Sequence, residues 1–255
     1  MTAVRLDEAV WQAVRQQASE PYRQAGRLAY HFARGKLEHD PMFRALLERG
    51  DLLPQARVLD LGCGQGLIAA VLHAAHQLHR AGQWPAQPPA PLGCVYQGFE
   101  LMPAVVQRAE RALASSFTQP RFACVDVSRA NLPPSDLILL LDVLHYVELP
   151  AQQGLLQRIR QALAPEGRLV LRVGDAAESQ RHSFSQWVDR WVVRARGHGA
   201  QPHFGRPLSS WVALLQDVGF AVDSLPMSQG TPFSNVLLVA HVPARATLTI
   251  EDTAA

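Results

Sequence analysis

The sequence predicts an α/β protein: a seven-stranded, mostly parallel sheet with helices on both faces, an N-terminal helical cap and a C-terminal antiparallel hairpin. Three patterns predict this fold. From Arg57 onward, short apolar runs alternate with helical stretches, as in parallel sheets whose strands are connected by helices. Apolar residues at helical spacing precede that point. Two β runs near the C-terminus are joined by a Gly-containing turn, which is typical of a hairpin.

The helical cap is expected over residues 1–53. Pro21 and Pro41 stand where helices commonly begin, because a proline in the first helical turn loses no hydrogen bond. Apolar residues recur at helical spacing over three stretches, 3–18, 21–36 and 40–50.

The sheet domain is expected over residues 54–243. Its predicted elements are strand 57–61, helix 66–80, strand 94–100, helix 103–115, strand 121–125, strand 136–141, helix 151–163, strand 167–173, helix 208–218 and the β runs 220–227 and 234–242. Gly219 is the expected C-terminal cap of the last helix.

Two insertions interrupt this alternation. Residues 82–93 are rich in proline, cannot form a helix and are expected to bulge at the surface. Residues 177–206 are expected to form a lid-like insertion with a helix over 177–199 that carries one apolar stripe. That stripe either packs on the core or covers a ligand cleft, because open α/β sheets bind ligands beyond the carboxyl ends of their strands. Residues 244–255 are expected to be a flexible tail.

Composition favours a soluble cytoplasmic protein. The N-terminus lacks the apolar stretch of a signal peptide, and no run approaches the roughly 18 apolar residues of a membrane span. Cys63, Cys94 and Cys124 show no paired or chelating spacing, which suits a reducing compartment. The formal net charge of +2 gives no indication of a nucleic-acid partner.

The stretch VLDLGCGQG, residues 58–66, predicts a ligand-binding loop after the first strand. Its three alternating glycines, Gly62, Gly64 and Gly66, allow a sharp turn and a close approach of the backbone to a ligand. Leu67 stands where a dinucleotide fingerprint needs a small residue, and no Lys-Ser/Thr pair of a P-loop follows. The Asp60 carboxylate disfavours a phosphate and favours a cation such as an ammonium group.

This stretch resembles motif I of the class I S-adenosylmethionine-dependent methyltransferases, which have a Rossmann-like fold. The resemblance extends from about Arg57 to Val242. It implies that the glycine loop, including Cys63, wraps the methionine part of S-adenosylmethionine. It also implies that Asp60 lies near the cofactor's ammonium group, directly or through water.

The resemblance continues along the chain. Glu100 and Leu101 follow the second strand, where the family places an acid that accepts both ribose hydroxyls. The Pro-rich insertion accounts for the unusually long gap before Glu100. Asp126 and Val127 follow the third strand, in the position that meets the adenine. Asp142 begins the segment after the fourth strand, DVLHY, which is similar to that of many small-molecule methyltransferases.

His145 and Asp142 are the predicted catalytic residues. His145 could take a proton from a hydroxyl nucleophile, because a histidine titrates near working pH; alternatively it caps a turn or shapes the pocket. Asp142 either orients the cofactor or fixes its loop. Weaker substrate candidates are Tyr146, Arg172, His182, Trp187 and His203, with Asp175 beside them. On the cap, Tyr22, Tyr30 and Arg34 could close over the cofactor or could simply pack between helices.

No metal site is expected. His73, His76 and His79 recur every three residues, but steps of three carry His79 about 120° around a helix from His73. A histidine cluster near a helix C-terminus is favoured by the helix dipole without any metal. The Asp-Asn pair of metal-dependent catechol-type methyltransferases is replaced by Gly174-Asp175-Ala176.

The acceptor is expected to be a small, partly apolar molecule, methylated on oxygen. The Asn/Asp-Pro-Pro-aromatic motif of nucleic-acid amino-methyltransferases is absent after the fourth strand. The catalytic lysines of ribose methylation and the double-acid loop of arginine methyltransferases are absent too. Two alternatives stay open: an RNA or protein methyltransferase on the same fold, and a non-catalytic subunit that only binds the cofactor. The sequence does not indicate the oligomeric state.

Overall fold

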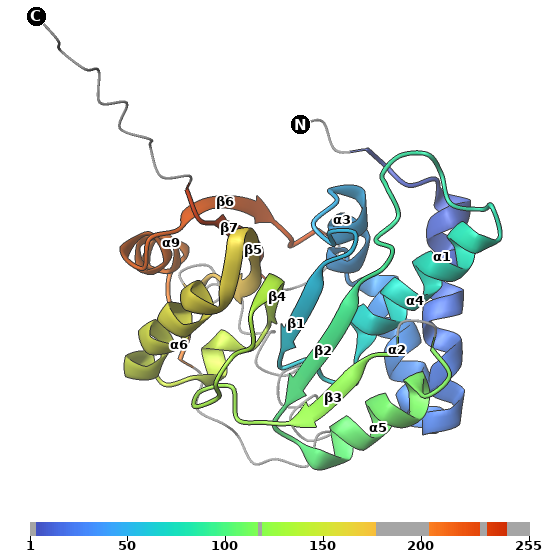
Figure 1. The fold of residues 1–255 in the computed structure, drawn as a ribbon, viewed down its shortest axis with the longest axis horizontal. Coiled ribbons are helices and arrows are strands. Elements are labelled where there is room, and N and C mark those ends of the chain that lie inside the picture. Colours follow the sequence, from blue (N-terminus) through green and yellow to red (C-terminus); the bar gives the residue numbers. More distant parts are fainter. Residues whose placement is uncertain (1–3, 117–118, 177–203, 230–233, 244–255) are drawn as a thin grey trace, which may run out of the picture.

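The computed structural model describes residues 4–116, 119–176, 204–229 and 234–243 (Figure 1). It contains one seven-stranded sheet in the order β3-β2-β1-β4-β5-β7-β6. The strands are β1 (Arg57–Leu61), β2 (Val95–Glu100), β3 (Arg121–Cys124), β4 (Ser135–Leu141), β5 (Leu163–Gly174), β6 (Ala221–Pro226) and β7 (Asn235–His241). The predicted fold class is confirmed.

Strands β1 to β5 are parallel, and β7 pairs antiparallel with both β5 and β6. The hairpin therefore joins the sheet through its second strand. β1 pairs with β2 on one side and with β4 on the other, so the strand order reverses at β1. In open α/β sheets, a ligand site is expected beyond the carboxyl ends of the strands at such a switch point.

Helices cover both faces of the sheet. α4 (Leu67–Arg80) and α5 (Pro103–Leu113) lie on one face, and α6 (Leu149–Ala162) and α9 (Leu208–Asp217) lie on the other (Figure 1). The alternation of side chains along each strand explains the division. In β5, Leu169 and Leu171 pack in the core under α6 and α9, whereas Val170 packs in the core under α4.

The cap consists of α1 (Glu8–Ser19), the 3₁₀ helix η1 (Glu20–Ala25), α2 (Arg27–His39) and α3 (Met42–Glu48). The prediction of one helix over 21–36 was wrong, because Gly26 adopts φ +111° and separates η1 from α2. The predicted first and third helices are shorter than expected. Asp7 is the N-cap of α1 and its side chain accepts the Ala9 amide. Asp40 lies just before Pro41, the N-cap of α3, and its side chain accepts the Met42 amide.

The starts of α6 and β5 also differ from the prediction. α6 begins at Leu149 instead of 151, because Pro150 is favourable in the first helical turn. β5 begins at Leu163 instead of 167, and its pairing with β4 is irregular between Ser135 and Leu137.

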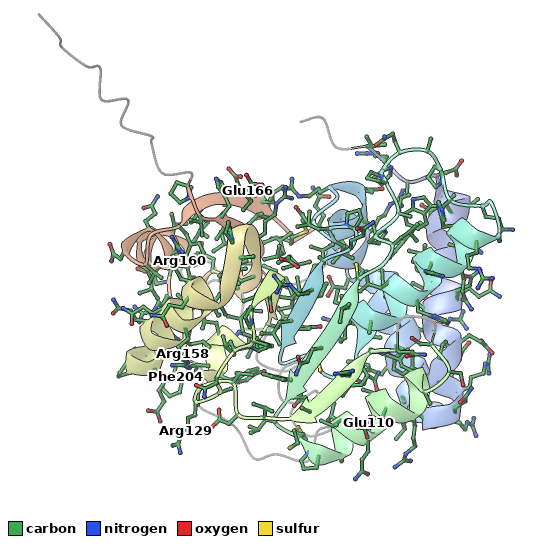
Figure 2. The ribbon with its side chains drawn as sticks, in the orientation of Figure 1. Glu110, Arg129, Arg158, Arg160, Glu166 and Phe204 are labelled. Carbon is green, nitrogen blue, oxygen red and sulfur yellow. The ribbon has the colours of Figure 1, made fainter. Side chains whose placement is uncertain are left out.

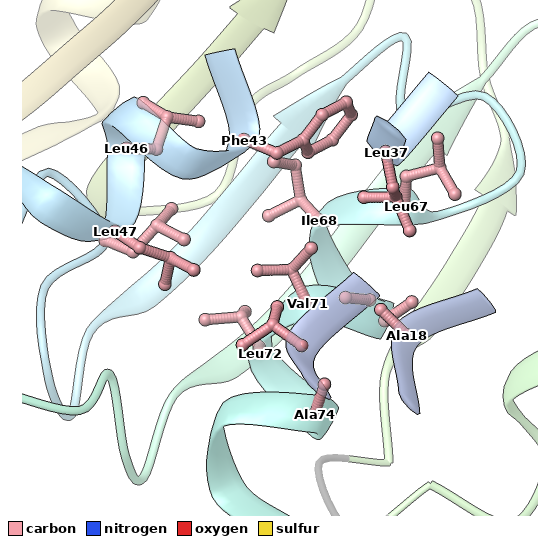
Figure 3. Packing of buried hydrophobic residues seen from close by; sticks show 14 of the residues in the cluster. Ala18, Leu37, Phe43, Leu46, Leu47, Leu67, Ile68, Val71, Leu72 and Ala74 are labelled. Carbon is pink, nitrogen blue, oxygen red and sulfur yellow. The ribbon is translucent and has the colours of Figure 1, made fainter. Parts of the chain in front are cut away.

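The cap shares one hydrophobic core with α4. Figure 3 shows Leu37, Phe43, Leu46 and Leu47 of α2 and α3 packing around Leu67, Ile68, Val71 and Leu72 of α4, and all of these side chains are buried. α1 packs against the same helix. The cap therefore lies directly over the helix that follows the glycine loop. Among the described residues, no helix has the length and apolar character needed to cross a membrane.

Candidate functional site

The glycine loop turns across the carboxyl end of β2. Its amides at Gly62 and Cys63 donate to the Phe99 carbonyl at 2.7 and 3.0 Å, so the loop is fixed to the neighbouring strand. Gly62, Gly64 and Gly66 have φ values of +76°, +56° and +79°. Residues with a Cβ rarely adopt this left-handed conformation, which explains the choice of glycine.

The three glycines have different surroundings. A Cβ at Gly62 would collide with the Val143 side chain, and a Cβ at Gly66 would lie 2.8 Å from the Phe122 ring. A Cβ at Gly64 would meet no atom within 4 Å. Two of the glycines thus make room for protein side chains, and Gly64 faces open space where a ligand could approach.

Asp60 is the penultimate residue of β1 and is 2% exposed. The Tyr96 hydroxyl donates to its Oδ2 at 2.6 Å. Burial, the largest cause, and the Glu100 charge together raise the pKa of Asp60 to about 7 against the lowering effect of the hydrogen bond from Tyr96. Burial also raises the pKa of the neighbouring Cys63 thiol. Asp60 therefore favours a positively charged partner, because a cation would help it to ionise.

Glu100 ends β2 beside the glycine loop. Its Oε2 accepts the Gly64 amide at 3.1 Å, and its Oε1 accepts the Met102 amide at 3.1 Å. Each carboxylate oxygen can accept more than one donor, so the half-buried Glu100 can still accept two hydroxyl groups. The residues thus fit a ligand that carries a cation and a diol. Leu101 follows at 58% exposed.

Asp126 and Val127 follow β3, next to the end of β2. The Val125 amide donates to the Glu100 carbonyl at 2.9 Å, which places this turn beside Glu100. Asp126 is exposed, and its Oδ1 accepts the Ser128 hydroxyl at 2.6 Å, which lowers the pKa of Asp126. Arg158 of α6 (Figure 2) fixes the turn, since it donates to the Ser128 carbonyl at 2.6 Å.

The segment after β4 contains Asp142 and the 3₁₀ helix η2 (Leu144–Tyr146). Asp142 has φ +59°, which is uncommon for a residue with a side chain. The His145 and Tyr146 rings lie 4.2 Å apart between centroids, and Tyr146 is 37% exposed. Because Val143 fills the space beside Gly62, this segment lies against the glycine loop.

Arg172 lies on β5 and is 1% exposed. Its Nε donates to Asp142 Oδ1 at 2.7 Å, and its Nη2 also contacts Asp142. Its Nη1 donates to both oxygens of Asp40, at 2.6 and 2.7 Å. Burial alone would raise the pKa of Asp142, but Arg172 and then Lys36 lower it to about 2. Asp142 is therefore ionised in the folded protein at neutral pH.

The cap contacts the glycine loop from the other side. The buried Tyr22 hydroxyl donates to the Gln65 carbonyl at 2.8 Å, and Gln65 Nε2 donates to the Ala29 carbonyl at 3.3 Å. Tyr30 instead accepts a hydrogen bond from Arg23 at 3.0 Å, and Arg34 is exposed. Sequence reasoning missed Gln65 and Tyr96. Side chains alternate between the two faces of a strand, so the sequence of β2 already places Tyr96 on the same face as Glu100 and could have indicated that it lies near the site.

The structure brings together Asp60, the glycine loop, Glu100 and the segment after β4, with Asp126 in the adjoining turn. His182, Trp187 and His203 lie outside the described residues, as does the predicted helix 177–199. Asp175 Oδ1 accepts the Leu208 amide at 3.2 Å, at the start of α9. In the described part of the chain, no group of three or more His, Cys, Asp or Glu side chains could hold a metal ion.

Known proteins resemble this chain in sequence and in fold. A family model described as a methyltransferase domain matches residues 30–225. Trans-aconitate 2-methyltransferase of Methylobacterium nodulans is 33% identical over 144 residues, which are 56% of this chain and 48% of that protein. The tetracenomycin polyketide synthesis 8-O-methyl transferase TcmO of Streptomyces glaucescens is 33% identical over 115 residues, 44% of this chain and 29% of that protein. The matches thus span about half or less of these curated relatives.

Solved structures resemble the whole fold. Magnesium protoporphyrin IX methyltransferase (ChlM) from Synechocystis PCC 6803 with bound SAH superposes with a TM-score of 0.55 at 17% identity, covering 92% of this chain and 99% of that chain. At this identity the likeness shows the fold.

Proposed function

The chain belongs to the methyltransferase-domain family, within the class I S-adenosylmethionine-dependent methyltransferases, and on that premise we propose that it methylates a small, partly apolar molecule on oxygen. The observation that carries the proposal is the convergence of buried Asp60, half-buried Glu100 and the open face of Gly64 at the switch point of the sheet. A carboxylate pair beside a glycine-rich loop suits a cation and a sugar diol.

When bound, S-adenosylmethionine supplies a methyl group made electrophilic by a sulfonium. In this proposal Asp60 orients the ammonium group, and Glu100 accepts the ribose hydroxyls. His145 would take the proton of the acceptor hydroxyl on a ring nitrogen as that oxygen received the methyl group, and S-adenosylhomocysteine would be the leaving product. Holding the two reactants in line supplies much of the rate enhancement.

The outer stripe of α2 supports a partly apolar acceptor. Leu28, Phe32 and Lys36 stand four residues apart, so they share one side of the helix. Lys36 reaches the segment after β4, with its Nζ 3.8 Å from Asp142 Oδ2. Phe32 is 41% exposed and Leu28 is 87% exposed on the same side. The curated relatives' names also describe small-molecule methylation, in one case on oxygen.

The decisive test incubates the protein with methyl-labelled S-adenosylmethionine and a small-molecule extract, and identifies the labelled product. We expect a labelled methyl ether or ester and release of S-adenosylhomocysteine.

The substitution His145→Ala should slow turnover about 10²–10⁴-fold with cofactor affinity unchanged. His79→Ala is the matched control, since exposed His79 lies at the far end of α4. Unchanged turnover in His145→Ala would exclude His145 as the base.

Cofactor affinity is expected to depend on pH through Asp60. Because its pKa is about 7 in the folded protein, binding a cation requires loss of a proton below that value. The association constant should therefore rise several-fold between about pH 6 and pH 7.5, and level off above. Calorimetric titration with S-adenosylhomocysteine across this range measures the effect. A flat profile in wild type, or the same slope in Asp60→Asn, would contradict it.

A further inference from the structure

Arg172 is a charged residue at an inward-facing position of a central strand. It shares the cap-facing side of β5 with Val170, yet it is 1% exposed. Its guanidinium binds two carboxylates from different parts of the chain: Asp40 from the cap and Asp142 from the segment after β4. A planar guanidinium suits such two-sided recognition, because its donors form a rigid fork.

We propose that Arg172 is a positioning residue for methyl transfer: it fixes the segment after β4 against the cap, and so sets where His145 and Tyr146 stand at the acceptor. This inference rests on the proposed function, since it assigns a role within the same site.

The backbone at Asp142 shows what is being fixed. Its φ of +59° is unfavourable for a residue with a side chain, so neighbouring contacts must hold it. Arg172 holds it twice, through its side chain and through its carbonyl, which accepts the Asp142 amide at 3.2 Å. η2, with His145 and Tyr146, begins two residues later. A rotation at Asp142 would therefore move both side chains.

Asp40, Lys36, Asp142 and Arg172 form a charged cluster, and its cap end is held by several contacts. Asp40 is 8% exposed, and its Oδ1 also accepts the Met42 amide at 3.0 Å, at the start of α3. Lys36 of α2 contacts Asp40 Oδ2 at 2.8 Å and lies 3.8 Å from Asp142 Oδ2. The segment after β4 is thus tied to both α2 and α3 through Arg172 and Lys36.

The charges within this cluster argue for positioning over binding. Lys36 and Arg172 carry two positive charges and Asp40 and Asp142 carry two negative charges, so the four side chains are neutral together. Such a cluster offers little attraction to a charged acceptor. A buried ion pair adds little to the free energy of unfolding, because the cost of desolvating the two charges offsets much of their attraction. Such a cluster is better suited to fixing one arrangement of the segments that carry it.

The test compares two arginines of the 255-residue chain, each of which binds an aspartate through its guanidinium group. Arg172→Lys keeps the positive charge and removes the fork. Arg57→Lys makes the same change in the Arg57–Asp136 pair, whose N–O distances are 2.8 and 2.9 Å. This pair lies at the amino ends of β1 and β4, away from the proposed site. Lys36→Met is a milder second variant, because Lys36 lies partly exposed at the edge of the cluster. For each protein, kcat, acceptor KM, S-adenosylhomocysteine affinity and amide hydrogen exchange are measured.

For Arg172→Lys we expect a loss of kcat of about tenfold or more, cofactor affinity within about twofold, and faster exchange at residues 142–146. Lys36→Met should show the same pattern at about two- to fivefold, and Arg57→Lys should show none of it. Loss of cofactor affinity in proportion to kcat, or an unchanged kcat in both cluster variants, would overturn the proposal, as would unchanged exchange at 142–146. If wild type makes no labelled product, the proposed function fails, and the exchange measurement still tests whether Arg172 fixes residues 142–146.

Discussion

Replacing Asp60→Asn is expected to weaken S-adenosylmethionine binding about 100-fold at pH 8 while leaving the fold at least as stable as wild type. Truncating one partner of a buried charge pair costs about 2–5 kcal/mol of binding free energy, and a tenfold change corresponds to about 1.4 kcal/mol. Asparagine keeps the shape and can still accept the Tyr96 hydroxyl, but it carries no charge for the cofactor's ammonium group.

The stability half of this prediction follows from the sign of the pKa shift. The pKa of Asp60 is raised from 3.8 to about 7 on folding, so between these values the folded protein holds a proton that the unfolded chain has lost. The free energy of unfolding therefore falls as pH rises toward 7, by about 4 kcal/mol in total. Above pH 7 the folded protein bears this cost in full, and asparagine removes it.

Calorimetry and thermal unfolding at pH 8 check both halves. Asp136→Asn is the control, because the same substitution is made at an aspartate that binds Arg57 near the start of β4, away from the site. It should lose stability and keep cofactor affinity. If Asp60→Asn bound the cofactor as wild type does, Asp60 would not face the ammonium group.

Features carried by local pattern were predictable from the sequence. The alternation of apolar runs and helical stretches predicted the seven strands and the helices on both faces of the sheet. Such predictions are possible because the spacing of apolar residues within one short segment indicates which of its side chains are buried. The glycine loop and Glu100 could be proposed from the sequence because each directly follows a predicted strand, where a motif can be read locally. The break at Gly26 was missed, because helical spacing continues across it while the backbone does not.

Contacts between distant segments were not predictable. Asp40 and Arg172 are 132 positions apart, and only the folded sheet shows that they meet. Part of the signal was nevertheless present: in β5, Arg172 alternates with Leu171 and Val173, which places it on the side of Val170. An arginine on that inward side requires partners, because a buried unpaired charge is too costly. Which carboxylates supply them depends on the path of the cap.

Gly62→Ala is expected to lower the free energy of unfolding by about 2–5 kcal/mol. The new methyl group would overlap Cγ2 of Val143 and lie 3.2 Å from Cγ1, and overpacking of this kind costs about 1–3 kcal/mol. The left-handed φ of +76° adds about 1–2 kcal/mol for a residue with a Cβ. Relief of the overlap would push Val143 away and so displace the segment that carries His145.

Gly64→Ala separates the role of packing from that of ligand approach. Its φ of +56° imposes similar backbone strain, but its Cβ would meet no protein atom within 4 Å. Chemical denaturation should therefore show a smaller loss for Gly64→Ala, whereas calorimetry should show the larger loss of cofactor affinity for that variant, because its methyl group enters the space open to the ligand. Adding Val143→Ala to Gly62→Ala should recover about 1–2 kcal/mol, as expected when two contacting groups are changed together. Equal destabilisation of the two alanine variants, with no recovery in the double variant, would show that backbone strain dominates and that contact with Val143 does not explain Gly62.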